Sequence, residues 1–311
     1  MKTKFQSRLT PASPALSEAA ATKVRFTKMH GLGNDYVYID GINEDLEPYD
    51  LTRLSRIVSD RNFGVGSDGL IVILPSETVD FRMRIFNPDG SEAEMCGNGI
   101  RAFAKYVYEH GLTNKTELTV QTGAGLVRPR LTVENGKVVS VRVDMGQPRL
   151  ARAEIPMTGQ PADRPVINEP LEVDGQQVRV TCVSMGNPHC VLFVEDVQTA
   201  PVEELGRKIE HHPVFPARTN VEFVEVLDRS QVNMRVWERG AGETLACGTG
   251  ASATCVACVL NDLTDRTINV HLHGGTLTIE WADNDHVYMT GPATEVYSGE
   301  LSEAVLSLAR L

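Results

Sequence analysis

Two cysteines lie in matching contexts in opposite halves of this chain, and this repetition restricts the folds that the chain can adopt. Residues 95–99 read MCGNG and residues 246–250 read ACGTG, so Cys96 and Cys247 are each followed by a glycine, a polar residue and a second glycine. A glutamate lies four residues before each cysteine, and an aromatic residue lies ten residues before it. Each motif leads into a stretch with helical periodicity.

A second pair of motifs precedes the cysteines at nearly equal distances. Residues 28–35 read KMHGLGND and residues 183–189 read VSMGNPH, and an apolar run follows each. Asn34 lies 62 positions before Cys96, and Asn187 lies 60 positions before Cys247. Self-similarity at a fixed distance is typical of repeated structural units. We infer a duplication, with two copies of one fold meeting at a cleft; chance similarity of glycine-rich loops is the alternative.

The size and composition agree with a two-domain globular protein. The chain has 311 residues, which corresponds to about two domains at ~150 residues each. No apolar run approaches the ~18 residues of a membrane helix, so we expect no membrane partner. The net charge of -11 disfavours a broad nucleic-acid surface, which requires a basic face. Residues 1–23 are rich in Ala, Ser, Thr and Pro and have no continuous apolar core, which predicts a disordered extension rather than a secretory signal. We therefore expect a cytoplasmic protein, with organelle targeting as the alternative.

Hydrophobic patterns predict a mixed α+β fold built from curved sheets, each around one helix. The expected helices cover residues 51–60, the segments after Cys96 and Cys247, residues 202–209 and a short tail after residue 301. The expected strands lie within residues 24–40, 70–74, 81–86, 117–143, 221–226, 232–237, 268–272, 275–281 and 287–290. Residues 148–170 contain five prolines and form the loosest stretch, which marks the entry to the second half.

Three further patterns predict structure rather than ligand binding. Residues 64–69 (GVGSDG) match the dinucleotide motif G-x-G-x-x-G, but a helical pattern precedes them and a strand follows, the reverse of the required order. We expect a tight turn near the cleft. The other cysteines lie in apolar runs and are expected in the core: Cys182, Cys190, Cys255 and Cys258. No residues have metal-ligand spacing, and neither a Schiff-base lysine nor a phosphate cradle is evident, so we predict no metal and no cofactor.

A cysteine at a helix start has a defined chemistry. Unpaired N–H groups and the positive end of the helix dipole favour negative charge, which lowers a thiol pKa from ~8.5 towards neutrality. The adjacent amides form an anion site. Two such helix starts facing each other would hold a carboxylate between them, with one sulfur on each side of the neighbouring carbon. This arrangement suits removal of a proton from one face and delivery of a proton to the other.

These motifs resemble those of the diaminopimelate epimerases, a family of cofactor-independent amino-acid epimerases with two cysteine acid/bases. The similarity extends over about residues 24–297 in family order, through MHGLGND (29–35), FNPDGSE (86–92), CGNG (96–99), MGNPH (185–189), RTN (218–220), ERGAGET (238–244) and CGTG (247–250). The resemblance implies two pseudo-symmetric domains, each a curved β-structure around a central helix. It places the N-terminal domain at residues 24–146 with a returning C-terminal segment, 292–311, and the second domain at 147–291. The returning segment is implied to contain a last strand at 294–301. Homodimers are frequent in the family.

The resemblance also implies roles for individual residues. Cys96 and Cys247 match the acid/base pair, and His189 and Glu238 match groups that tune the thiol pKa values. The residues implied in substrate binding are Asn34, Asn87, Gly97, Asn98, Asn187, Asn220, Glu238, Arg239, Gly248 and Thr249. Some members have a glutamine where this chain has Gly69, so another group or water is expected to cover that contact.

The function implied is the interconversion of LL- and meso-diaminopimelate, a step towards lysine and peptidoglycan precursors. A proline or hydroxyproline racemase-like enzyme of the same fold is the nearest alternative. A non-catalytic binding or thiol-redox protein that uses the same cleft is an alternative of another class.

Overall fold

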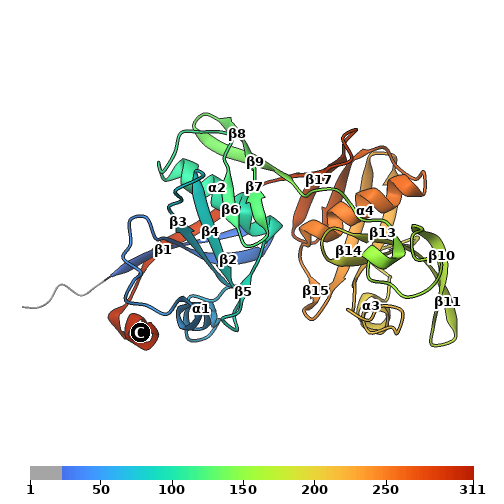
Figure 1. Cartoon of the computed structure of the whole chain (residues 1–311), viewed down its shortest axis with the longest axis horizontal. Helices are drawn as coiled ribbons and strands as arrows, with labels where there is room; N and C mark the ends of the chain where they lie inside the picture. Colours follow the sequence, from blue (N-terminus) through green and yellow to red (C-terminus); the bar gives the residue numbers. More distant parts are fainter. Residues whose placement is uncertain (1–22) are drawn as a thin grey trace, which may run out of the picture.

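The protein consists of two sheet-rich halves that lie side by side (Figure 1). A computed structural model describes residues 23–311, so the predicted disordered extension lies outside the described residues except for Lys23. The element order β-β-α-β-β-β-α-β-β occurs once from β1 to β7 and again from β11 to β17. The predicted α+β class with two pseudo-symmetric domains is confirmed. No helix in residues 23–311 is long and apolar enough to cross a membrane.

The first sheet has eight strands in the order β19-β1-β2-β3-β4-β6-β7, with β5 paired to β4. They are β1 (Val24–Gly31), β2 (Asn34–Asp40), β3 (Leu70–Leu74), β4 (Phe81–Phe86), β5 (Glu92–Ala93), β6 (Val120–Thr122), β7 (Gly125–Val127) and β19 (Thr294–Leu301). The helices of this half are α1 (Leu51–Ser59), α2 (Gly97–Glu109) and α5 (Glu303–Ala309).

The second sheet has eleven strands in the order β10-β11-β12-β13-β14-β16-β17-β18-β9-β8, with β15 paired to β14. They are β8 (Arg130–Glu134), β9 (Lys137–Asp144), β10 (Val166–Val173), β11 (Gln176–Ser184), β12 (Pro188–Phe193), β13 (Asn220–Asp228), β14 (Gln231–Glu238), β15 (Gly242–Thr244), β16 (Thr267–Leu272), β17 (Gly275–Trp281) and β18 (Val287–Gly291). Its helices are the short 3-10 turn Arg152–Glu154, α3 (Val202–Glu210) and α4 (Gly248–Leu260).

The duplication extends to the strand pairing. β1 and β2 pair antiparallel, as do β11 and β12, and β2 pairs parallel with β3 as β12 does with β13. The parallel pair β4 and β6 corresponds to β14 and β16. The halves are also linked, because β19 returns to pair with β1 while β9 pairs with β18. The strands β8 and β9, expected in the N-terminal domain, thus belong to the second sheet, whereas β19 pairs within the first sheet, where the returning segment 292–311 was expected. We keep the domain boundaries at residues 146 and 291 as a proposal.

Most predicted elements occur where the sequence placed them, with one difference. The strands 70–74, 81–86, 275–281 and 294–301 have the predicted bounds. The helix after Cys96 starts at Gly97, so the cysteine lies at a helix start as predicted. The predicted loose stretch to Pro170 is wrong at its end, since β10 already begins at Val166. Proline is tolerated there because β10 is an edge strand, and its pairing is irregular between Val166 and Glu169.

The two central helices are buried, and one hydrophobic core joins the halves. Residues of α2, such as Phe103, and of α4, such as Cys255, belong to the same buried cluster, which also includes Met289 between them in the fold. Separate smaller clusters lie under α3 and under α1 with α5. The α5 helix is bound by backbone hydrogen bonds as well, since the Asp50 N–H donates to the Ala309 carbonyl at 2.8 Å. The C-terminal tail is thus an integral part of the first half.

The docking of α5 can be tested with two leucines on opposite faces. Leu306 is fully buried in the cluster under α1, whereas Leu308 is 65% exposed. We expect Leu306→Ala to lower the free energy of unfolding by about 2–5 kcal/mol, because it leaves a cavity. Leu308→Ala, the matched control, should stay within about 0.5 kcal/mol of wild type. Urea unfolding measures both, and equal effects would contradict the docking.

Candidate active site

A cleft of about 880 Å³ lies between the two halves and contains most of the residues singled out from the sequence. The predicted site residues that line it are Asn34, Cys96, Gly97, Asn98, Asn187, Glu238, Arg239, Cys247, Gly248 and Thr249. His189 lies behind this wall, fully buried. Asn87 and Asn220 do not line the cleft. The structure thus brings together residues from both copies of the repeat.

Each cysteine is the N-cap residue of the central helix in its half. Cys96 precedes α2 and Cys247 precedes α4, both in extended backbone conformation. The Gly99 N–H donates to the Cys96 sulfur at 3.3 Å, and the Gly250 N–H donates to the Cys247 sulfur at 3.3 Å. Sulfur accordingly takes the place of the oxygen that usually caps a helix. The two sulfurs have equivalent backbone environments.

The two helix starts abut at the centre of the cleft. The Asn98 amide nitrogen donates to the Ala246 carbonyl at 3.4 Å, which links the first turn of α2 to the residue before Cys247. Met289 packs against both glycines that follow the cysteines. A Cβ atom at Gly248 would lie 2.9 Å from the Met289 sulfur, and one at Gly97 would lie 3.1 Å from its methyl group. Both distances are shorter than ordinary van der Waals contact, so a side chain at either glycine would require the end of Met289 to shift.

The environment of the Cys247 thiol differs from the prediction. A helix start was expected to lower the thiol pKa, but burial raises the pKa of Cys247 well above its usual value, and the carboxylates of Glu238 and Glu222 add to this effect. Burial also raises the pKa of Glu238. Desolvation and nearby negative charge thus outweigh the hydrogen bonds from Thr249 and Gly250, which act in the opposite direction.

A buried histidine connects Cys247 to a carboxylate that the sequence did not single out. His189 Nδ1 lies 2.6 Å from Glu222 Oε1, and both side chains are fully buried. His189 Nε2 lies 3.0 Å from Asn187 Oδ1. The Asn187 amide nitrogen donates to the Thr249 hydroxyl at 3.3 Å, and this hydroxyl lies 3.5 Å from the Cys247 sulfur. These contacts form a chain from His189 to the Cys247 sulfur, whereas Glu238 lies close to the sulfur.

The Cys96 sulfur has a shorter set of contacts. Its thiol donates to Asn34 Oδ1 at 3.4 Å. The Tyr36 side chain, also on β2, lines the cleft, and burial together with the nearby Cys96 sulfur raises the Tyr36 pKa above its usual value. Tyr36 was not predicted, because it reads as one apolar position in a strand.

A buried arginine lies beneath the start of α2. The Arg101 side chain is fully buried and donates to the carbonyls of Gly97 at 3.2 Å and Pro292 at 3.3 Å. It forms no ion pair with the described residues, and its Nη2 atom has no hydrogen-bond partner among them. Burial lowers the Arg101 pKa to about 10. The sequence feature that could have indicated Arg101 is a charged residue inside an apolar helical pattern.

Two of the predicted substrate contacts, Asn220 and Asn87, have hydrogen-bond partners within the protein. The Asn220 side chain is 3% exposed; it accepts from the Arg239 N–H at 2.9 Å and donates to the Pro188 carbonyl at 2.8 Å. The Asn87 amide donates to the Ser91 hydroxyl in a turn. Arg239 itself is exposed at the cleft and donates to the Ala217 carbonyl at 3.0 Å.

The G-x-G-x-x-G segment forms a turn before β3. A Cβ atom at Gly64 would lie 2.1 Å from the Ile57 carbonyl oxygen, and one at Gly69 would lie 2.3 Å from the Phe86 carbonyl oxygen. No side chain fits at Gly69, so the glutamine of some relatives has no counterpart there. Within residues 23–311, His, Cys, Asp and Glu side chains form no group of three or more that could hold a metal ion.

Comparisons with known proteins identify the family of this chain. The family model for diaminopimelate epimerase matches residues 26–151 and 181–296. Diaminopimelate epimerase from Moorella thermoacetica is 60% identical over 278 residues, covering 89% of this chain and 99% of that protein. The protein of the same name from Methanococcus maripaludis strain S2 is 54% identical over 279 residues, covering 89% of this chain and 99% of its own length. The chain belongs to the diaminopimelate epimerase family.

Solved structures of other proteins share the fold of this family member. A phenazine biosynthesis protein of the PhzF family from Bacillus anthracis superposes with a TM-score of 0.64 at 18% identity, covering 90% of this chain and 99% of that one. A hydroxyproline epimerase from Agrobacterium vitis superposes with a TM-score of 0.63 at 15% identity, covering 90% and 93%. At these identities the likeness concerns the fold alone.

The burial of the six thiols predicts their reactivity in the native protein. Cys96 is partly exposed, Cys247 is 5% exposed with a raised pKa, and the other four are at most 1% exposed. With iodoacetamide and mass spectrometry, we expect Cys96 to be alkylated first, because the exposed thiolate is the reactive form. Cys247 should react slowly at neutral pH and faster as the pH rises. Labelling of Cys182 or Cys255 as fast as Cys96 would contradict this order.

Proposed function

We propose that this chain interconverts LL- and meso-2,6-diaminopimelate by a two-base mechanism in which Cys96 and Cys247 are the acid/base pair. The observation that supports this most directly is that the two cysteines cap equivalent helices and line one cleft. Membership of the diaminopimelate epimerase family supports the same substrate. The reaction supplies a precursor for lysine and peptidoglycan.

In this mechanism one sulfur is a thiolate and the other is a thiol, on opposite faces of the substrate α-carbon. The thiolate takes the α-proton and becomes a thiol, while the other thiol gives its proton to the opposite face and becomes a thiolate. The configuration at carbon is thereby inverted. The reverse reaction exchanges the roles of Cys96 and Cys247, which suits two sulfurs in equivalent backbone positions.

The reacting carboxylate would bind where the two helix starts abut. The first backbone N–H groups of α2 and α4 have no partner within their helices, and both helix dipoles direct their positive ends there. Gly97 and Gly248 lack side chains that would block the approach. Negative charge that develops on the carboxylate when the α-proton leaves would be stabilised by the same groups.

The other end of the substrate would be held by side chains along the cleft. Asn34, Asn187 and Arg239 line it and carry suitable donors and acceptors. For Asn220 we now favour an indirect role, because its side chain supports the Arg239 backbone. Direct contact from Asn87 remains a prediction. Glu238 and His189 are proposed to tune Cys247. Homodimer formation, a cytoplasmic location and the lack of nucleic-acid or membrane partners also remain predictions.

Substrate choice can be tested on protein dialysed exhaustively against a chelator. We expect LL-diaminopimelate to exchange its α-proton with D₂O and to yield the meso isomer, without added metal or pyridoxal phosphate. Proline, the substrate class of the nearest rival, should show no exchange. Turnover of proline alone, or activity only after a metal or pyridoxal phosphate is restored, would overturn this assignment. No turnover of any amino acid in the presence of reductant would favour a binding protein.

The acid/base pair can be tested by serine substitution. Cys96→Ser and Cys247→Ser each replace a thiol by a hydroxyl, which is a poor base at neutral pH. Because a positioned acid/base group contributes about 10²–10⁴-fold, each variant should lose at least that factor in turnover. The double variant should lose far less than the product of both factors, since the two residues act as a unit.

Cys255→Ala is the control for this pair. Cys255 is fully buried in α4, so its loss should lower stability through packing and leave turnover of the folded fraction unchanged. If either serine variant kept more than roughly a tenth of wild-type turnover, which is a smaller loss than the low end of the expected range, the two-thiol assignment would be wrong.

A further inference from the structure

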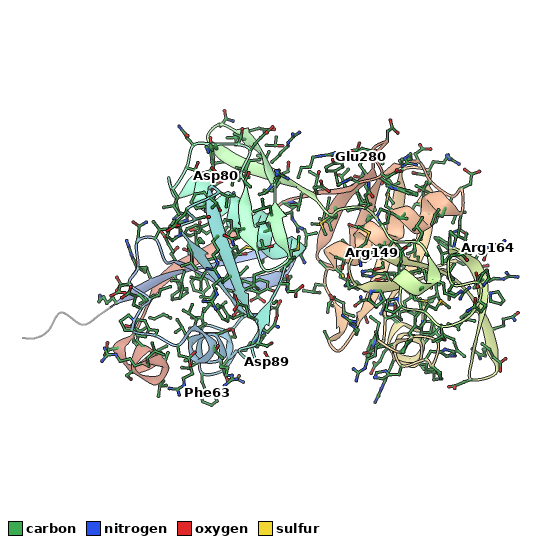
Figure 2. All side chains as sticks on the ribbon, viewed as in Figure 1. Phe63, Asp80, Asp89, Arg149, Arg164 and Glu280 are labelled. Atoms are coloured by element: carbon green, nitrogen blue, oxygen red, sulfur yellow. The ribbon has the colours of Figure 1, made fainter. Side chains whose placement is uncertain are left out.

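The loop that contains the glycine motif leads from the outer surface to the cleft. Phe63, 89% exposed, points away from the first half beside α1 (Figure 2). Five residues later, Asp68 lies next to Asn34 on the cleft wall. The glycine motif precedes the strand β3 and does not open a helix, so a role in nucleotide binding does not account for its aspartate.

Both carboxylate oxygens of Asp68 are held in place. Oδ2 accepts from the Asn34 amide nitrogen at 2.8 Å and from the Asp35 N–H at 3.1 Å. Oδ1 accepts from Arg61 at 2.7 Å, and the same guanidinium pairs with Asp35 at 2.9 Å. Lys28 binds the other side of Asp35 at 2.5 Å. Asp68 is thus fixed by a network of alternating charges at the end of β1 and β2.

This contact determines which way the Asn34 amide faces. An ionised carboxylate can only accept hydrogen bonds, so Asn34 must turn its amide nitrogen towards Asp68. The oxygen of the amide then faces the Cys96 sulfur, at 3.4 Å. An acceptor at this distance pairs with a protonated thiol and disfavours a thiolate.

The equivalent amide in the second half has the opposite orientation. Asn187 receives a hydrogen bond from His189 Nε2 on its oxygen and directs its nitrogen to Thr249, on the side of Cys247. No carboxylate contacts the Asn187 amide among the hydrogen bonds of the described residues. The duplicated site therefore differs at the position that Asp68 controls.

We propose that Asp68 is a positioning residue that orients Asn34 so that an acceptor oxygen faces Cys96. This inference depends on the proposed acid/base role of Cys96 only for its effect on turnover. In the proposed reaction Cys96 alternates between thiol and thiolate. The N–H groups at the helix start stabilise the thiolate, and the acceptor oxygen of Asn34 stabilises the thiol, so the two contacts oppose each other.

Asp68→Asn tests the orientation. The new amide can offer an oxygen or a nitrogen, so Asn34 is free to turn its own nitrogen towards the sulfur. A donor in place of an acceptor, and the loss of a nearby negative charge, both favour the thiolate. The other titratable groups around the sulfur, Tyr36 and Tyr38 from β2 and Arg101 from α2, are unchanged. We expect alkylation of Cys96 by iodoacetamide at pH 7 to become about three- to tenfold faster, as one hydrogen bond would produce.

Three controls separate orientation from other effects. Asp60→Asn weakens the same loop, since Asp60 accepts from the N–H groups of Asn62 and Phe63 at 2.7 and 2.8 Å, but it does not contact Asn34. It should leave Cys96 alkylation within twofold of wild type. Alkylation of Cys247 should be unchanged in both variants. In an Asn34→Ala background, Asp68→Asn should give only the smaller part of the increase that comes from the lost negative charge.

Several results would overturn the inference. One is an unchanged rate of Cys96 alkylation in folded Asp68→Asn, and another is the same rate increase in Asp60→Asn. A third is the full rate increase when Asp68→Asn is made in the Asn34→Ala background, because Asp68 would then act through its charge alone. If Asp68→Asn does not fold, Asp68→Ser provides the same freedom to Asn34 and the same readout. Alkylation needs no turnover, so this test is independent of whether diaminopimelate is the substrate; an epimerase pH profile shifted to lower pH would add the link to catalysis.

Discussion

The structure depends on the contact between two helix starts that would repel each other in isolation. The positive dipole ends of α2 and α4 meet at Gly97 and Gly248, and the buried Arg101 adds a third positive group without an ion-pair partner in the described chain. A continuous hydrophobic core that includes both helices and Met289 holds them there. The packing of this core thus holds three positive groups close together in spite of their mutual repulsion. An anion bound between them would reduce that repulsion, and this explains why the centre of the cleft suits a carboxylate.

The duplication explains why the sulfurs have equivalent backbone positions, and it does not extend to their side-chain neighbours. In each half the side chains behind the sulfur lie at a parallel strand pair, β2 with β3 and β12 with β13. The first half places Asp68, in the loop before β3, against Asn34 of β2, and the second half places Glu222 of β13 against His189 of β12. The two sulfurs, one a thiol and the other a thiolate in the proposed reaction, therefore have unequal side-chain environments.

Much of the fold could be predicted from the sequence. The repeated motifs indicate the duplication, and the apolar periodicity indicates the strands and the central helices. The two cysteines were evident for the same reason. Asp68 and Glu222 were not, because each lies more than thirty residues from its partner, and only the parallel strand pairing joins them. The pKa of Cys247 was predicted in the wrong direction, since a helix start is a local feature whereas burial and the carboxylates of Glu238 and Glu222 are tertiary.

The opposing charges around the two thiols are complementary to the head of an amino acid. A bound α-carboxylate would offset the positive charge of the two helix starts and Arg101, while an ammonium group near Glu238 would offset the carboxylates that disfavour a thiolate at Cys247. Without these two charges, burial and the carboxylates of Glu238 and Glu222 hold the pKa of Cys247 well above its usual value. A zwitterionic ligand supplies both charges at once. Binding would then bring the two thiols closer in proton affinity, which is the condition for exchanging a proton across one carbon in both directions.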